Sequence, residues 1–269
     1  MREIAYAKIN LALHVRRRRD DGYHELETLF AFVDAGDLLV ARPSDRDELT
    51  VSGEFAPQLT DPFGNLVAAA LGKLPRAGGL SLALEKNLPV AAGLGGGSAD
   101  AGAVFRIVDA LHGLPGDWLR RAAALGADVP ACIASRMCLG HGSGTDLAPI
   151  INDLEDAPVI LVNPRAPLAT GAVFAVWSGE DRGPLPVGPA SIVTQQGRND
   201  LEDSAVALVP EIADVLSALR RTGASVARMS GSGATCFALY SDPAAQAAAA
   251  AQLAGEHPGW WIMEGKLRP

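Results

Sequence analysis

A glycine-rich run, Pro89–Asp100 (PVAAGLGGGSAD), is the part of the chain whose residues could best bind an anion. Its glycines lack side chains, so the backbone N–H groups can approach an anion closely. An alternating apolar run at Leu80–Glu85 predicts a strand before it, and Ser98–Leu111 predicts a helix after it, whose N-terminus adds N–H donors and a positive dipole end. The segment therefore predicts a polyphosphate site, and we expect a side chain at Gly95–Gly97 to obstruct the anion.

Two common phosphate motifs do not fit this loop. A Walker loop fails because Ala103 stands where lysine is required. A dinucleotide fingerprint fails because its third glycine would fall on Ser98 or Asp100. A tight strand-to-helix turn without a ligand is the alternative that the loop alone leaves open.

A second small-residue loop, Ser230–Ala234, follows the strand-like run Ser225–Met229 and precedes Thr235–Tyr240. A hairpin turn would explain it alone, because Gly-Ser-Gly suits such turns. Two glycine loops in separate halves of the chain suit a nucleotide held between two lobes.

Lys8 and Asp128 are the two charged residues whose positions could serve catalysis. Lys8 lies in an apolar strand-like run, Ile4–Val15, although lysine is seldom buried without a partner. A lysine on an edge strand that reaches solvent is the simpler interpretation. Asp128 precedes Val129-Pro130, where a loop carboxylate or a helix N-cap is equally simple.

The composition narrows the class of protein. The chain has 269 residues, 48% of them hydrophobic and 20% charged, as in globular proteins, and a net charge of −8. That acidity disfavours nucleic-acid and anionic-membrane partners. The charged start of the chain does not resemble a signal peptide, and three cysteines without Cys-x-x-Cys spacing suit a reduced, cytoplasmic protein. The histidines show no metal-ligand spacing, so we expect no structural metal site.

The order of elements predicts a mixed α+β fold of two lobes, because strands and helices interleave without strict β-α-β alternation. We expect domains at 1–151 and 152–269. The polar run Arg16–Gly22, with arginines at 16–19, predicts a solvated hairpin turn. Residues 178–198 are expected to be a loop, and the further helices are expected at 65–74, 117–125, 169–177, 201–221 and 243–253.

Taken together, the motifs resemble the GHMP kinases, a superfamily of small-molecule kinases. The resemblance rests on Pro89-x-x-x-Gly-Leu-Gly-Gly-Gly-Ser-Ala, on the late Gly-Ser-Gly-Ala loop and on their order. Further segments are similar to the branch that acts on a cytidine-diphosphate-linked sugar alcohol: Ala7-Lys-Ile-Asn-Leu11, Asp21-Gly-Tyr-His24, Leu125-Gly-Ala-Asp-Val-Pro130 and Asn199-Asp200. The resemblance covers nearly the whole chain. It implies a two-lobed fold with the active site in the cleft between the lobes.

The resemblance implies an ATP-dependent phosphotransferase that phosphorylates the 2-hydroxyl of 4-diphosphocytidyl-2-C-methyl-D-erythritol, in the non-mevalonate route to isoprenoid precursors. ATP, with Mg²⁺ bound to it, and this small-molecule substrate are the implied ligands, and the sequence leaves the oligomeric state open. Lys8 and Asp128 would flank the acceptor hydroxyl, with Lys8 keeping Asp128 ionised by charge pairing. The implied substrate contacts are Asn10, Tyr23, His24, Thr170 and Phe174. The implied ATP loop is Pro89, Val90, Ala91, Ala92, Gly93, Leu94, Gly95, Gly96, Gly97, Ser98 and Ala99.

The chain departs from the family pattern at a few positions. Ala91 and Ala92 stand where the family often has glycine, and Gly171 stands where proline is frequent. Neither departure removes a group that does chemistry. Another GHMP small-molecule kinase and a non-catalytic relative with the same fold are the alternative functions. Tyr23, His24 and Phe174 argue against the first, because a small alcohol needs no pyrimidine site, and the Lys8 and Asp128 pair argues against the second.

Overall fold

The computed structural model describes residues 1–59 and 65–269, and contacts within the chain divide it into two compact units. Unit 1 consists of Met1–Lys8, Ala35–Val90 and Gly95–Ser135, and unit 2 of Ile9–Asp34, Ala91–Leu94 and Arg136–Pro269. The strands β1 (Arg2–Arg18) and β2 (His24–Ser44) contribute residues to both. The domain boundary expected after residue 151 stays a prediction, because these contact-defined units interleave along the chain. Within the described ranges, no helix is long and apolar enough to cross a membrane.

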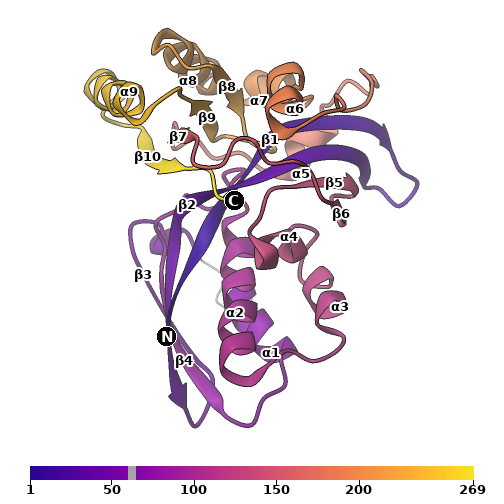
Figure 1. Cartoon of the computed structure of the whole chain (residues 1–269), viewed down its shortest axis with the longest axis vertical. Helices are drawn as coiled ribbons and strands as arrows, with labels where there is room; N and C mark the ends of the chain where they lie inside the picture. Colours follow the sequence, from indigo (N-terminus) through magenta and orange to yellow (C-terminus); the bar gives the residue numbers. More distant parts are fainter. Residues whose placement is uncertain (60–64) are drawn as a thin grey trace. The chain divides into compact units, whose positions relative to one another are not determined.

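Unit 1 joins a small sheet to a helical layer. The end of β2 pairs antiparallel with β4 (Gly79–Glu85), which pairs in parallel with β3 (Glu48–Ser52). Its helices are a short 3₁₀ turn at Ala56–Gln58, α1 (Leu66–Lys73), α2 (Gly96–His112), α3 (Trp118–Ala123) and α4 (Val129–Ala134). The long helix α2 packs against α1 and α4 (Figure 1). Gly102 permits the close approach to α4, since an added Cβ would lie 2.7 Å from the Cys132 backbone.

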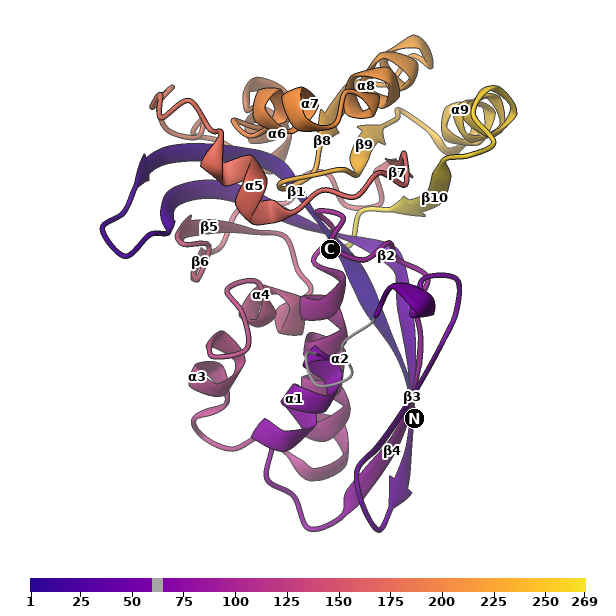
Figure 2. The same ribbon diagram turned by 180° about the vertical axis from the view of Figure 1, so that it is seen from behind.

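Unit 2 contains two groups of strands and most of the later helices. The start of β2 pairs with β5 (Cys138–Gly142), and β5 pairs with β6 (Asp146–Ala148). A four-stranded antiparallel sheet has the order β10–β7–β9–β8, from Trp261–Lys266, Pro158–Asn163, Cys236–Leu239 and Val226–Met229. The helices α8 (Glu211–Arg221) and α9 (Pro243–Glu256) pack on this sheet (Figure 2). Buried apolar side chains of these elements, such as Ile160, Val162 and Leu216, form its core.

The structure corrects three expectations about secondary structure. The expected loop at 178–198 contains a helix, α6 (Ala190–Gln196). The expected helix at 201–221 is two helices, α7 (Glu202–Leu208) and α8, because Pro210 has no N–H donor and disfavours a helical conformation at the preceding Val209. The arginines 16–18 belong to β1 rather than to the hairpin turn, so strand alternation, not the turn, sets the direction of their side chains.

Candidate active site

The later half of the predicted phosphate loop lies at the start of α2, in unit 1. Gly95 occupies the N-cap of this helix with φ +60°, a left-handed conformation that glycine adopts without steric cost. It has no side chain to cap the helix, and the first N–H groups of any helix lack intrahelical acceptors. Helix α2 has 17 residues, so the loop ends in a substantial dipole. These donors fit an anionic ligand such as a phosphate group.

Lys8 and Asp128 meet directly beside this helix start. The Nζ of Lys8 lies 3.0 Å from Oδ2 of Asp128, with the lysine side chain 5% exposed and the aspartate side chain 31% exposed. Gly95 makes room for them, because an added Cβ would lie 3.0 Å from Cε of Lys8 and 3.8 Å from Oδ2 of Asp128. A buried ammonium, an accessible carboxylate and a glycine loop therefore share one location in unit 1.

This geometry decides against the simpler interpretations of both residues. Lys8 does not extend to solvent as an edge-strand lysine would, since it is buried against the carboxylate. Asp128 does occupy the N-cap position of α4, but its side chain makes no capping hydrogen bond. The carboxylate is instead directed to the ammonium, which leaves its second oxygen able to accept another proton donor.

The middle of the glycine loop, Ala91–Leu94, belongs to unit 2, where it contacts the second glycine loop. The Ser230 hydroxyl donates to the Gly93 carbonyl over 2.8 Å, and the Thr235 N–H donates to the Ala92 carbonyl over 3.2 Å. An added Cβ on Gly93 would lie only 2.2 Å from the Ser230 carbonyl oxygen, so no larger residue fits without a backbone shift. Asn199 holds the second loop by donating to the carbonyls of Met229 and Gly231, each over 2.8 Å.

Asn10, predicted as a substrate contact, lies inside this arrangement and not in the pocket described below. It is 3% exposed. Its backbone N–H donates to the Ser230 hydroxyl over 3.1 Å, and its amide nitrogen donates to the Thr28 hydroxyl over 2.7 Å. Its contacts support the glycine loop, and a direct substrate contact stays a prediction.

The other four predicted substrate residues line one pocket of about 360 Å³ in unit 2. They are Tyr23, His24, Thr170 and Phe174. The rings of His24 and Phe174 lie 4.7 Å apart at 33°, and Phe174 comes from α5 (Thr170–Ala175). Tyr23, which lies between β1 and β2, is 68% exposed. The hydroxyl groups of Thr170 and Ser232 form a 2.9 Å hydrogen bond. The pocket has a size and an aromatic lining that fit a planar base.

His24 brings an unsatisfied polar atom to this pocket. It is 8% exposed, and its Nε2 is buried without a hydrogen-bond partner among the described residues. Burial, and then the nearby charge of Arg18, lower the pKa of His24. The ring is therefore neutral near pH 7, and its unpaired nitrogen can exchange a hydrogen bond with a bound heterocycle.

Some pocket residues were missed by the sequence reasoning. Arg18, Leu26 and Ser143 also line the pocket, and the Trp177 ring lies edge-on to His24 at 5.6 Å. The sequence predicts a solvated turn for the arginine run; Arg18 is exposed, but it belongs to β1 and lines the pocket, so its placement in the turn is wrong. The signal was strand alternation, which places Arg18 on the same face as Arg16 instead of in the turn.

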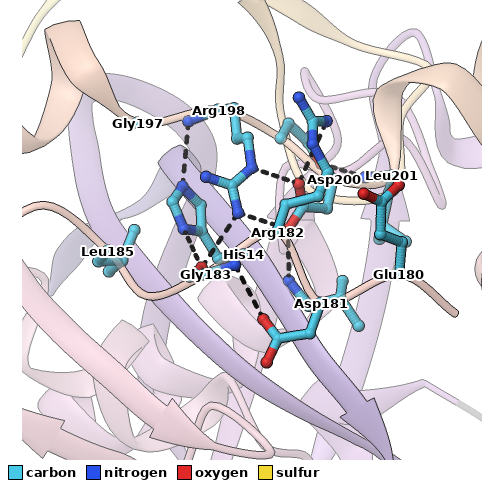
Figure 3. Close-up of polar contacts among 12 residues, drawn as sticks. His14, Glu180, Asp181, Arg182, Gly183, Leu185, Gly197, Arg198, Asp200 and Leu201 are labelled. Atoms are coloured by element: carbon cyan, nitrogen blue, oxygen red, sulfur yellow. Dashed lines mark hydrogen bonds and ion pairs between the residues drawn. The ribbon is translucent and has the colours of Figure 1, made fainter.

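The segment after α5 is fastened to the β1–β2 hairpin by a polar network (Figure 3). The Arg16 guanidinium donates to both oxygens of Asp181, over 2.8 and 3.1 Å, and also pairs with Glu27. The Gly183 carbonyl accepts from Arg198 over 3.0 Å and lies 3.1 Å from Nδ1 of His14. These contacts fix the hairpin that carries Tyr23 and His24.

The network also defines the state of His14, which is fully buried. Its Nδ1 faces a carbonyl and so carries the proton, while its Nε2 accepts the Arg198 N–H over 3.3 Å (Figure 3). Burial, followed by the charge of Arg198, lowers the pKa of His14. Asp200 completes the network, because it accepts from Arg198 over 2.6 Å and from the Val15 N–H over 2.9 Å.

Comparison with known proteins shows the family of this chain. Residues 65–136 match the model of the GHMP kinases N terminal domain, and residues 189–258 match that of the GHMP kinases C terminal domain. The 4-diphosphocytidyl-2-C-methyl-D-erythritol kinase of Novosphingobium aromaticivorans is 64% identical over 268 residues, which cover 100% of this chain and 93% of the relative. The enzyme of the same name from Erythrobacter litoralis is 61% identical and covers 99% of both chains.

Solved structures give the same result. A crystal structure of 4-(cytidine 5'-diphospho)-2C-methyl-D-erythritol kinase superimposes with a TM-score of 0.84 at 35% identity, covering 100% of both chains. Homoserine kinase from Cytophaga hutchinsonii, at a TM-score of 0.65 and 19% identity, shares the fold. The expected α+β GHMP kinase fold is confirmed, whereas the expected active-site cleft stays a prediction. The chain belongs to the GHMP kinases and, within them, to the 4-diphosphocytidyl-2-C-methyl-D-erythritol kinase family.

Proposed function

We propose that this protein is an ATP-dependent kinase that phosphorylates the 2-hydroxyl of 4-diphosphocytidyl-2-C-methyl-D-erythritol. The observation that carries the proposal is the 3.0 Å contact of Lys8 with Asp128 beside the N-cap of α2. It supplies a positioned acceptor for the hydroxyl proton, a cation for the transferring group and backbone donors for phosphates. The family names of the close relatives specify the acceptor.

Asp128 receives the proton in this reaction. Its partly exposed carboxylate accepts the hydroxyl proton while the hydroxyl oxygen forms a bond to the γ-phosphorus and the bond from that phosphorus to the β,γ-bridging oxygen of ATP breaks. The proton passes from Asp128 to solvent after transfer. Lys8 orients the carboxylate and stabilises negative charge near the transferred group. The products are ADP, the phosphorylated alcohol and a proton.

The ATP phosphates are held by backbone donors at Gly95–Ser98 in this proposal. The glycine N-cap and the uncapped start of α2 fit such a ligand. Within residues 1–59 and 65–269, no three His, Cys, Asp or Glu side chains gather as a metal site. A divalent cation such as Mg²⁺ would reach the site with the nucleotide, on its phosphate oxygens, and would neutralise part of their charge.

The cytosine is recognised by the pocket that contains His24 and Phe174. The aromatic faces supply stacking, and the unpaired Nε2 of His24 supplies a polar contact for the base edge. A kinase for a small alcohol such as homoserine would have no use for such a site. This feature favours the cytidylylated acceptor over other GHMP kinase substrates.

The test is to incubate the protein with ATP, Mg²⁺ and one alcohol at a time, and to follow ADP release. We expect turnover with the cytidine-diphosphate-linked methylerythritol and little with homoserine, galactose or mevalonate. Turnover of one of those three without the cytidylylated substrate would identify a different GHMP kinase. Absence of turnover with every alcohol would favour a non-catalytic relative of the fold.

A further inference from the structure

A buried ionic cluster in unit 1 lies outside the machinery described above. Lys86, just before the glycine loop, is 2% exposed, and its Nζ contacts Oδ2 of Asp37 and lies 2.8 Å from Oδ2 of Asp100. Asp37 and Asp100 are 0% and 3% exposed. One ammonium thus faces two carboxyl groups in a buried site. Burial of this kind is costly unless the charges are balanced.

The cluster joins three parts of the chain that surround the start of α2. Asp37 comes from β2, and its Oδ1 accepts the N–H groups of Asn87 and Leu88 over 2.6 and 2.8 Å. Lys86 directly follows the last residue of β4, and Asp100 lies in the second turn of α2. The cluster therefore ties the strand, the segment that leads to Pro89 and the helix to one another.

Gly96, the first residue of α2, lies directly over the cluster. An added Cβ would be 3.5 Å from Nζ of Lys86 and 3.8 Å from Oδ2 of Asp37. A side chain placed at position 96 would therefore point toward the cluster. This direction revises the expectation that a side chain there would obstruct the anion directly. The charge of the cluster acts on the same backbone donors that the proposed ATP site uses.

The hydrogen-bond arrangement indicates one extra proton in the cluster. Oδ2 of Asp37 and Oδ2 of Asp100 both contact Nζ of Lys86, so two buried carboxyl groups meet at one ammonium, which can balance only one negative charge. Both oxygens of Asp37 already accept hydrogen bonds, whereas Oδ1 of Asp100 is buried without a partner. An unsatisfied buried oxygen is more costly on an ionised carboxylate than on a neutral carboxylic acid, which favours the neutral form of Asp100. Burial, opposed by the charge of Lys86, raises the pKa of Asp100 well above its usual range, and the Asp37 charge adds to this.

We propose that Asp37, Lys86 and Asp100 are positioning residues for the phosphate loop, and that the two carboxyl groups share one proton so that the cluster beneath Gly96 carries no net charge. The cluster then contains one positive ammonium, one negative carboxylate and one neutral carboxylic acid, so its charges cancel. A second negative charge there would oppose the binding of a polyphosphate to the N–H groups above it. The cluster acts on ATP affinity through the loop and does not touch the acceptor.

The proton is tested by infrared spectroscopy of the purified protein at pH 8, which needs no activity. We expect a carbonyl band of a protonated carboxylic acid in the wild type and its loss in Asp100→Asn. Asp117→Asn is the matched control, because Asp117 is a partly exposed carboxylate that pairs with Arg120 and Arg121. Absence of the band in the wild type, or its persistence in Asp100→Asn, would overturn the shared proton.

The positioning role is tested by steady-state kinetics on the same folded variants, and only this second test rests on the proposed function. Asparagine replaces a neutral carboxylic acid isosterically, so Asp100→Asn should keep the KM for ATP within about threefold. Asp100→Ala should raise it by about tenfold or more, with the KM for the acceptor unchanged. Equal effects of both variants on the KM for ATP would contradict the proposal. So would a loss confined to melting temperature, with kinetic constants per folded molecule unchanged.

Discussion

The ammonium of Lys8 and the carboxylate of Asp128 are 3.0 Å apart. The two residues are far apart in the sequence, because Lys8 lies in β1 and Asp128 directly precedes α4. The lysine is buried and the aspartate is partly open. Such a pair combines a fixed cation with an accessible proton acceptor, which is the arrangement that phosphoryl transfer to an alcohol needs.

Asp128→Asn should lower kcat by about a hundredfold or more, because it removes the group that accepts the hydroxyl proton. Lys8→Met should also lower kcat strongly, since it leaves that carboxylate without its cation. The double variant should lose far less than the product of both losses, because the residues act as a unit. Rapid-quench or steady-state assays at saturating ATP measure this. Near-normal kcat in Asp128→Asn would refute the catalytic role.

Gly95→Ala should impair catalysis more than Gly96→Ala. At Gly95 the backbone has φ +60° and an added Cβ would lie 3.0 Å from Cε of Lys8, so alanine is strained and displaces the lysine. At Gly96 the Cβ meets only ordinary contacts of 3.5 Å or more. We expect a fall in kcat of about tenfold or more for Gly95→Ala, the scale of a misplaced reacting group. Comparable kcat in the two variants would argue that Gly95 does not shape the Lys8 site.

Phe174→Ala should raise the KM for the cytidylylated acceptor by about tenfold to a hundredfold, the range of one base–aromatic stacking contact. The KM for ATP should not change. Val176→Ala is a suitable control, since Val176 follows α5, is 51% exposed and does not line the pocket. An unchanged acceptor KM in Phe174→Ala would place the base elsewhere.

The free energy of unfolding should depend on pH through His14. Its folded pKa is lowered below the ordinary value of 6.5, by burial first, so the unfolded state binds the proton more strongly. The contribution of His14 is therefore complete above about pH 6.5 and is lost as the pH falls toward the folded pKa. Urea unfolding between pH 5 and 8 should show this slope.

The matched comparison for this slope is His14→Phe against His112→Leu. The first removes the buried imidazole and should flatten the pH dependence, although it also leaves the Gly183 carbonyl without one contact. The second changes an exposed histidine at the end of α2 and should leave the slope intact. Equal slopes in wild type and His14→Phe would assign the pH dependence to other groups.

Ala91→Gly should stabilise the protein by about 1 kcal/mol, because Ala91 holds φ +53° in the left-handed region that is costly for residues with a Cβ. Ala92→Gly is the control, and it should lower the free energy of unfolding. Ala92 is 5% exposed and is not among the residues with positive φ, so its change removes a buried methyl group and adds backbone freedom to the unfolded chain, and both effects destabilise the protein. Chemical denaturation of both variants measures the difference.

The sequence alone determined the elements that local chemistry controls. The glycines of the loop, the alternating run before it and the apolar helix after it predict the strand, loop and helix from short-range pattern, and the structure has β4, the loop and α2 there. Motif order was sufficient to identify the superfamily, which the comparisons confirm. Tyr23, His24, Thr170 and Phe174 were assigned together from that resemblance, and they line one pocket.

Only the tertiary structure decided which polar groups are buried and what they contact. Lys8 and Lys86 are both lysines near apolar strands, yet one faces Asp128 and the other faces Asp37 and Asp100. Arg18 lines the pocket because β1 continues into the first residues of the expected turn. Local pattern cannot give these outcomes, because burial and electrostatic partners depend on segments far apart in sequence that meet only when the chain folds.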